Sequence, residues 1–311
     1  MSLSIRKLSP ELQEIAKSQL NENESNILEI LTQFKQWIEK SPHLKSRMDD
    51  QFLIMFLRGC KYSLERAKQK LDMFYTVRTH VPEFMGTRER FDEKAITILR
   101  LGSMLALPQA EKNGPRIIII RPGSYDATKY DIRDILQVFM LINDLLLIED
   151  DHLTVAGSLS ILDLKDVTLN HLTQMTPSVV KKMTMMMQDA SPIRQKGIHY
   201  INTPVGFEKV MNLFKSFMNE KMKKRIYVHG NDMNSLFKVI PRKLMPKDYG
   251  GDSDSISEII EQWEQKIRAN YEYLQDEITK YGVDEKKRIG KSKNPETLFG
   301  IDGTFRQLEI D

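Results

Sequence analysis

Four consecutive isoleucines at positions 117 to 120 constrain this chain more than any other short segment. They stand between Arg116 and the turn-forming Arg121-Pro122-Gly123, and a short β-branched run with such boundaries predicts a buried strand. Further strands are predicted at 158–164, 197–202 and 226–229, with amphipathic or apolar helices between them. Because strands that alternate with helices favour parallel pairing, we expect an α/β fold built on a mainly parallel sheet.

The first 100 residues have a different pattern, in which apolar residues recur at helical spacing. Three such segments, near 27–38, 52–57 and 64–78, end at Ser41-Pro42, at Gly59 and before Pro82. We therefore expect an N-terminal helical module over residues 1–100 and the α/β domain over residues 101–283. That domain ends in a helix with one apolar face from Ile256 to Ile278, and the polar tail, 284–311, is expected to be loosely held.

Composition limits the environment of the chain. At 311 residues, with 41% hydrophobic and 29% charged residues, it can bury a core large enough to enclose a cavity. No apolar run reaches the ~18 residues that span a bilayer, and Met1 to Lys7 lacks the apolar region of a signal peptide, so a cytoplasmic location is expected. Cys60 is the only cysteine, which excludes an internal disulfide and a thiolate metal cage.

The common catalytic motifs are absent: there is no GxSxG, GxxxxGK[ST], GxGxxG or HExxH. No two of the six histidines have i, i+4 spacing, so neither a helical metal site nor any other metal is expected. His199 and His229 lie in predicted strands, and we interpret them as a hydrogen-bonded core pair before a base or ligand. Asp163, at a strand end, is interpreted as a structural cap before an acid or base. We expect no catalytic residues and no enzyme.

An amphipathic helix is predicted from Val205 to Met218. The residues of its apolar stripe are Phe207, Val210, Met211, Phe214 and Met218. Alone, this pattern is typical of a packed surface helix. The preceding helix, however, carries Met-Thr-Met-Met-Met at 183–187, and flexible methionines suit a wall that must fit an irregular apolar ligand. The helix is therefore a candidate lid over a cavity.

The apolar helix 132–148, with its isolated Asn143, supplies a second wall for the expected cavity, because small-molecule sites are mostly apolar with few polar groups. The expected occupant is one hydrophobic small molecule, with no other cofactor. The candidate pocket residues are Leu136, Phe139, Met140, Asn143, Leu147, Ile161, Met175, Val179, Met183, Met186, Met187, Ile193 and Ile198.

Positive charge is concentrated around the candidate lid. Residues 181–247 contain 14 Lys and Arg against 4 Asp and Glu. Two clusters precede successive strands and should meet at one end of the sheet as a phosphate cradle, although each alone could be a solvated face. The candidate headgroup residues are Arg194, Lys196, Lys221, Lys223 and Arg225. Nucleic acid is disfavoured as a partner, since exposed aromatics do not interleave with these charges.

Several motifs resemble one family. Residues 51–75, with Gln-Phe-Leu-Ile-Met-Phe-Leu-Arg-Gly-Cys-Lys-Tyr at their start, resemble the N-terminal module of CRAL-TRIO proteins. Thr-Pro-Ser-Val-Val-Lys-Lys at 176–182 and Gly-Ile-His-Tyr-Ile-Asn-Thr-Pro at 197–204 resemble the α-tocopherol transfer protein branch. The resemblance continues through 220–226, 229–231 and 244–251 and covers roughly residues 25–275.

This resemblance implies a lipophilic ligand enclosed between a sheet and a mobile gate helix. It also implies that Arg194, Lys196, Lys221 and Arg225, with Lys223 also basic, bind phosphoinositide headgroups beside the gate. The family's glycine and aromatic after the strand-end aspartate are replaced by Asp166 and Val167, and methionines replace branched aliphatic pocket residues. The ligand therefore stays open among tocopherol, retinoids, carotenoids, sterols and phospholipid.

The expected function is that of a monomeric carrier. It would dock as a peripheral protein on endosomal or other phosphoinositide-bearing membranes and exchange its ligand there. The alternative is a phosphoinositide-sensing regulatory or scaffold module that transfers nothing. A lipid hydrolase ranks third, because no nucleophile with a nearby base is visible.

Overall fold

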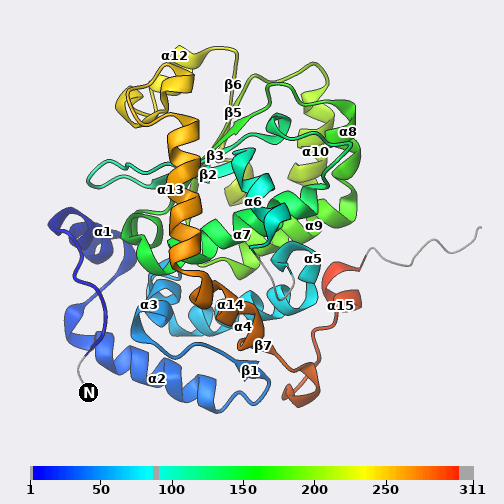
Figure 1. Ribbon diagram of the computed structural model, residues 1–311. Coiled ribbons are helices and arrows are strands. Elements are labelled where there is room, and N and C mark those ends of the chain that lie inside the picture. Colours follow the sequence, from blue (N-terminus) through cyan, green and yellow to red (C-terminus); the bar gives the residue numbers. More distant parts are fainter. Residues whose placement is uncertain (1–2, 87–90, 301–311) are drawn as a thin grey trace, which may run out of the picture.

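The computed structural model describes residues 3–86 and 91–300, and its N-terminal part is helical (Figure 1). The three helices predicted from apolar spacing are confirmed as α2, α3 and α4, and Asp49 caps α3 by accepting a 2.8 Å hydrogen bond from the Phe52 amide. The helices of this part are α1 (Pro10–Leu20), α2 (Ile27–Glu39), α3 (Asp50–Gly59), α4 (Leu64–His80), α5 (Pro82–Met85) and α6 (Glu93–Arg100).

A five-stranded sheet follows, in the order β2-β3-β4-β5-β6. Its strands are β2 (Met104–Ala106), β3 (Arg116–Ile120), β4 (Ser158–Asp163), β5 (Gln195–Ile201) and β6 (Ile226–Gly230). Only β2 runs antiparallel to its neighbour, so the predicted mainly parallel α/β sheet is confirmed. A separate antiparallel pair joins β1 (Leu44–Lys45) to β7 (Gly282–Val283).

Strand register decides which residues share a face of the sheet. Ile118, Ser160 and Ile198 occupy matching positions on β3, β4 and β5. Because side chains alternate along a strand, Ile119, Ile161 and His199 point to the opposite face. The first face meets the helices that follow β3 and β4 and is the one that the site uses.

The helices that follow β3, β4 and β5 are α7 (Ile132–Glu149), α8 (Leu169–Gln174), α9 (Pro177–Met185), α10 (Phe207–Phe217) and α11 (Glu220–Lys223). Figure 1 shows α8, α9 and α10 together at the right of the view. The α9 helix widens at its end into a π-helical turn, η4 (Met186–Ala190), and such turns often occur at functional sites. The other π-helical turn, η3 (His152–Ala156), precedes β4.

The C-terminal helix predicted as continuous is divided in two, α13 (Ile256–Ala269) and α14 (Tyr271–Thr279). The break falls at Asn270, whose φ of −115° and ψ of 24° are not helical. The Trp263 indole nitrogen donates a 2.8 Å hydrogen bond to the Ala106 carbonyl and so ties α13 to β2. A short helix, α12 (Met233–Phe237), precedes this region, and 3₁₀ turns lie at Glu24–Asn26, Pro122–Ser124, Arg242–Leu244, Lys247–Tyr249 and Glu285–Lys287.

The segment after Asp284 differs from the loosely held tail that we expected. Arg288 and Lys293 contact Asp72 of α4 at 2.8 and 2.5 Å, and a last short helix, α15 (Pro295–Phe299), buries Phe299. These contacts hold the segment through residue 300, whereas 301–311 lie outside the described residues. The sequence does not predict this packing, because the segment is rich in charged residues whose ion-pair partners lie on a distant helix.

One hydrophobic core extends from α2 through the sheet and α7 to Phe299. The helical module and the α/β domain therefore pack through a shared interior on both sides of residue 100. Of the helices described, none is both long and apolar enough to cross a bilayer.

Candidate binding site, an apolar cavity beside a basic cleft

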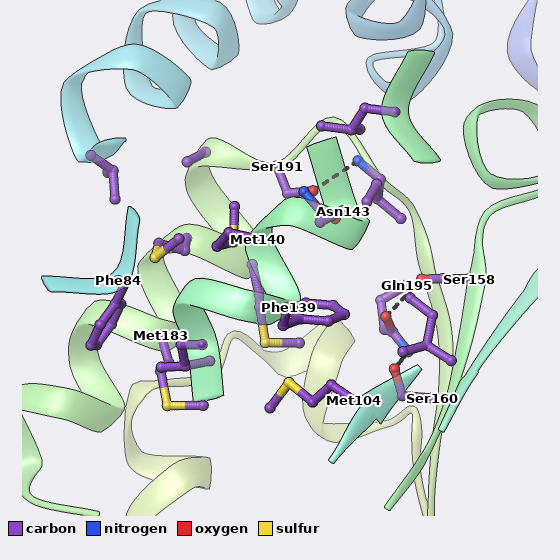
Figure 2. Close-up of a pocket in the computed structure, with 18 of the residues that line it drawn as sticks. Phe84, Met104, Phe139, Met140, Asn143, Ser158, Ser160, Met183, Ser191 and Gln195 are labelled. Atoms are coloured by element: carbon purple, nitrogen blue, oxygen red, sulfur yellow. Dashed lines mark hydrogen bonds between the residues drawn. The ribbon is translucent and has the colours of Figure 1, made fainter. Parts of the chain in front are cut away.

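A cavity lies between the sheet, α7, the α9–η4 segment and the N-terminal helices α4 and α5 (Figure 2). The space open to the centre of a water molecule is about 150 Å³. Nine candidate pocket residues line it, namely Leu136, Phe139, Met140, Asn143, Leu147, Met183, Met186, Met187 and Ile193. Hydrocarbon and thioether groups dominate this lining, as expected for a site that accepts an apolar molecule.

Four candidate pocket residues lie elsewhere. Ile161 points to the opposite face of the sheet, where it pairs in register with Ile119. Ile198 lies under α10, and Met175 and Val179 pack against the main core without lining the cavity. Ile161 is misplaced because apolar and serine residues alternate along β4, and the serines are the ones that face the cavity.

Sequence reasoning missed the part of the lining that comes from distant segments. Phe74, Val77 and Arg78 on α4 and Phe84 on α5 close one side of the cavity. The remaining lining residues that were not predicted are Met104, Ile118, Ile120, Ser158, Ser160, Ala190, Ser191 and Gln195. The N-terminal module is therefore a wall of the site and not only a neighbour.

The uncharged polar groups that the sheet and α7 present to the cavity are of two kinds. The Gln195 amide accepts from the Ser158 hydroxyl at 2.8 Å and donates to the Ser160 hydroxyl at 3.0 Å, so these three side chains satisfy one another. Asn143 is different, because no described residue forms a hydrogen bond with its amide. Figure 2 shows Asn143 beside the cavity on α7. An amide in such a place is a natural partner for a polar atom of a ligand.

The predicted lid helix is α10, which we call the gate helix. It begins at Phe207, and Val205 before it is fully exposed. Phe207 packs on Tyr200 with ring centroids 5.0 Å apart, and Met211 and Met218 join Ile198 in an apolar cluster apart from the main core. The other two stripe residues, Val210 and Phe214, are half-buried. No residue of the gate helix is among those that line the cavity, so the helix packs on the cavity face of the sheet but does not cover the cavity itself, as the predicted lid would.

A second depression, which we call the basic cleft, lies where the α3–α4 turn meets η4, β5 and α11. Its volume is about 610 Å³, and the predicted cations Arg194, Lys221 and Arg225 line it. Three further cations that were not predicted, Lys61, Arg66 and Lys70, come from the helical module. Among the described residues that line the cleft, only Asp189 is acidic.

The two remaining candidate headgroup residues stand at the edge of this cleft or outside it. Lys196 does not line the cleft but is close enough to Arg194, Arg225 and Lys61 for their charges to act on it. Lys223 pairs with Glu220 at 2.8 Å on the first turn of α11 and does not line the cleft. The structure therefore brings four of the five predicted cations together.

The cations of the basic cleft destabilise one another. Burial, followed by the charges of Arg194 and Arg225, lowers the pKa of Lys196 to about 8. Burial and then the Arg225 charge lower the pKa of Lys221 and of Arg194 as well. A bound phosphate would relieve this repulsion and accept charge-assisted hydrogen bonds, so the cleft is suited to an anion.

The cavity and the basic cleft share a wall. Met187, Ser191, Ile193 and Gln195 line both spaces. The wall is held against the helical module at Gly59, where a Cβ atom would lie 2.1 Å from the Pro192 carbonyl oxygen. Only glycine permits this close approach of the two backbones.

The other polar residues singled out from the sequence lie on the far face or at the edge of the sheet. His199 Nδ1 and His229 Nε2 are 3.0 Å apart, so the predicted pair forms. Asp163 accepts hydrogen bonds from Tyr249 at 2.6 Å and Asn202 at 2.7 Å, as a structural cap would. In the parts of the chain that the structure describes, no three or more His, Cys, Asp or Glu side chains gather as a metal site.

A mainly parallel sheet with an apolar cavity and a helix closed over the same face defines a lipophile-binding domain. Residues 102–251 match the CRAL/TRIO domain, and residues 23–95 match the Pinta-like UBA domain. Human alpha-tocopherol transfer protein-like is 31% identical over 245 residues, which are 78% of this chain and 71% of that protein. Human Clavesin-2 is 29% identical over 78% of this chain and 75% of its own length.

The chain therefore belongs to the CRAL-TRIO family, whose members bind lipophilic ligands and transfer them, and it is similar to the alpha-tocopherol transfer protein-like branch. A solved structure titled "Crystal structure of Sfh5" superimposes with a TM-score of 0.47 and 13% identity, and covers 86% of this chain and 100% of that one.

Proposed function

We propose that this protein carries one hydrophobic small molecule and exchanges it at membranes that contain phosphoinositides. The observation that supports this proposal is the wall shared by the apolar cavity and the basic cleft. It places a site for an apolar ligand directly beside a site for an anionic headgroup. In this proposal the protein acts as a cytoplasmic monomer that visits endosomal or other phosphoinositide-bearing membranes.

Movement of the gate helix would enlarge the cavity for a long cargo. Ile118 and Ser160, which line the cavity, share a sheet face with Ile198, which lies under the gate. If the gate side chains withdraw from Tyr200 and Ile198, the cavity extends along this face. A cargo then gains roughly 0.8 kcal/mol for each CH₂ group buried, so the gate must close again for slow leakage into water.

Asn143 supports a cargo with one uncharged polar group. Its amide lacks a protein partner, and the other polar side chains from β4 and β5 are already paired. A tocopherol, a retinoid or a hydroxylated carotenoid has this chemistry, with a long hydrocarbon part for the methionine-rich wall. Sterols and phospholipids are tested in the same experiment.

Organic extraction and mass spectrometry of the purified full chain test the cargo directly. We expect one lipophilic molecule per chain after expression in cells that contain such lipids. A folded protein that extracts empty, and that takes up none of the lipids named above, would instead support the alternative of a phosphoinositide-sensing scaffold that transfers nothing.

Charge reversal tests the role of the basic cleft. Lys221→Glu combined with Arg66→Glu should slow transfer of retinol to phosphatidylcholine vesicles that contain phosphatidylinositol bisphosphate, while affinity for retinol stays within about twofold. We leave Arg225 unchanged because it also donates to the Gln195 carbonyl, and its loss would disturb β5. Lys223→Glu is the control, since Lys223 lies outside the cleft. Equal transfer by all three proteins would contradict the proposed docking site.

A further inference from the structure

Gln188 joins the basic cleft to the end of the gate helix. Its side-chain amide donates a 3.1 Å hydrogen bond to the carbonyl of Phe217, the last residue of the gate helix. Its side-chain oxygen accepts a 2.9 Å hydrogen bond from the Asn219 amide. One side chain in η4 thus satisfies two backbone groups on either side of the point where the gate helix ends.

The backbone of Gln188 is held from the other side of the cleft. Lys70 of α4 donates a 2.8 Å hydrogen bond to the Gln188 carbonyl. Lys70, Gln188 and Asn219 all line the basic cleft, so the whole connection is exposed to an ion bound there. Burial lowers the pKa of Lys70, because its ammonium group is partly removed from water.

The segment after the gate helix also leads into the cleft. The Asn219 side chain caps α11 by accepting a 2.9 Å hydrogen bond from the Met222 amide. Lys221, within that helix, lines the cleft. A movement of α11 toward an anion would therefore pull on the same residue whose backbone amide is bonded to Gln188.

We propose that Gln188 is a latch that holds the gate helix closed and releases it when a phosphate group occupies the basic cleft. The proposal rests on the proposed function for the purpose of the gate, but its geometry involves only protein groups. A phosphate accepts stronger, charge-assisted hydrogen bonds from Lys70 than the neutral Gln188 carbonyl does. The anion therefore binds more tightly when Lys70 has left Gln188, and this difference in affinity shifts the gate toward its open state.

Amide hydrogen exchange of residues 207–217 measures the latch without any cargo. In the wild-type full chain we expect these amides to be protected when the cleft is empty. When phosphate occupies the cleft, they should exchange about tenfold faster, which is the effect expected for the loss of one or two ordinary hydrogen bonds. Two sources of phosphate are compared: free inositol trisphosphate, and phosphatidylcholine vesicles with and without phosphatidylinositol bisphosphate. A response to the free compound identifies the headgroup as sufficient, and a response to vesicles alone identifies the membrane-bound lipid.

Gln188→Ala should give fast exchange of the gate helix without any phosphate and little further increase when phosphate is added. Gln188→Met keeps the length of the side chain but has no amide, and it should behave in the same way. It shows whether the effect of Gln188→Ala comes from the lost amide or from lost packing. Gln33→Ala is the control, because Gln33 is an exposed glutamine of α2 whose amide donates to Glu29, and it does not line the cleft. Binding of inositol trisphosphate by the variants should be equal to or tighter than in wild type.

The latch is refuted if wild-type exchange responds to neither source of phosphate, or if both Gln188 variants keep the wild-type protection and response. This outcome would leave the carrier function standing, because extraction of a cargo is measured separately. Conversely, an empty cavity together with a Gln188-dependent gate would contradict the carrier function and support the latch.

Discussion

Replacing Asn143 by leucine separates the stability of the empty protein from recognition of its cargo. The Asn143 amide faces an apolar cavity and has no described partner. A fully buried amide without hydrogen bonds costs about 1 to 3 kcal/mol. Asn143 is half-buried, and a water molecule can recover part of this cost in a cavity with about 150 Å³ open to it. We therefore expect the unfolding free energy of empty Asn143→Leu to rise by roughly 1 kcal/mol.

Cargo affinity should change in the opposite direction. A C20 isoprenoid alcohol that bonds to the amide should bind about fivefold more weakly to Asn143→Leu, which corresponds to roughly 1 kcal/mol for one neutral hydrogen bond. The hydrocarbon of the same skeleton should bind at least as tightly as before. Titration of both ligands into the wild type and the variant gives the four affinities, and denaturant unfolding gives the stabilities.

Met140→Leu is the matched control, since Met140 lines the same cavity from the same helix and the change removes no polar group. It should alter the affinities for the alcohol and the hydrocarbon equally. If Asn143→Leu destabilises the empty protein, or lowers the affinities for the alcohol and the hydrocarbon by the same factor, the amide does not act as an unpaired recognition group.

Three further predictions concern the gate, the histidine pair and the C-terminal segment. Phe207→Asp should speed release of bound retinol by at least tenfold without loss of the unfolding transition, whereas Lys209→Asp on the exposed side of the gate should not. Burial, and then the charge of His229, lower the pKa of His199 to about 4. As the pH drops from 6.5 to 4, His199 therefore takes up a proton in the unfolded state before it does so in the folded state, and the free energy of unfolding falls by roughly 2 to 3 kcal/mol. His199→Gln should flatten this part of a stability profile measured by denaturant, and an unchanged slope would exclude His199 as its source. Arg288→Ala removes one of the cations that pair with Asp72 and should lower the free energy of unfolding by about 3 kcal/mol. The segment after residue 284 should then become sensitive to proteolysis. A variant as resistant to protease as the wild type would disprove this prediction.

Local pattern predicted the parallel strands of the sheet but not its antiparallel edge strand β2, and it could not assign the faces of β4. In Ser158-Leu159-Ser160-Ile161 the apolar residues mark one face and the serines the other. Hydrophobicity alone favours the apolar face for a lipid site. The serines can line the cavity because Gln195 satisfies their hydroxyl groups, and that partner comes from a neighbouring strand. The alternation therefore predicts two faces without saying which one the helices cover.

Contacts between modules were beyond the reach of local pattern. Phe74 and Phe84 close the cavity only because the helical module docks on the α/β domain, and nothing in their own segments indicates this. The basic cleft offered a partial signal. Arg66 and Lys70 lie four residues apart on α4, shortly after Lys61, so a basic stripe could have been read from the sequence.

If the cavity and the basic cleft hold the two proposed ligands, the wall between them couples the two binding equilibria. Met187, Ser191, Ile193 and Gln195 each have one space on either side, so a cargo that displaces them changes the surface offered to the anion. If an anion weakens cargo binding by some factor, the cargo must weaken anion binding by the same factor. A full carrier would then leave a membrane more readily than an empty one, and the direction of transport would be decided by occupancy and not by an external energy source.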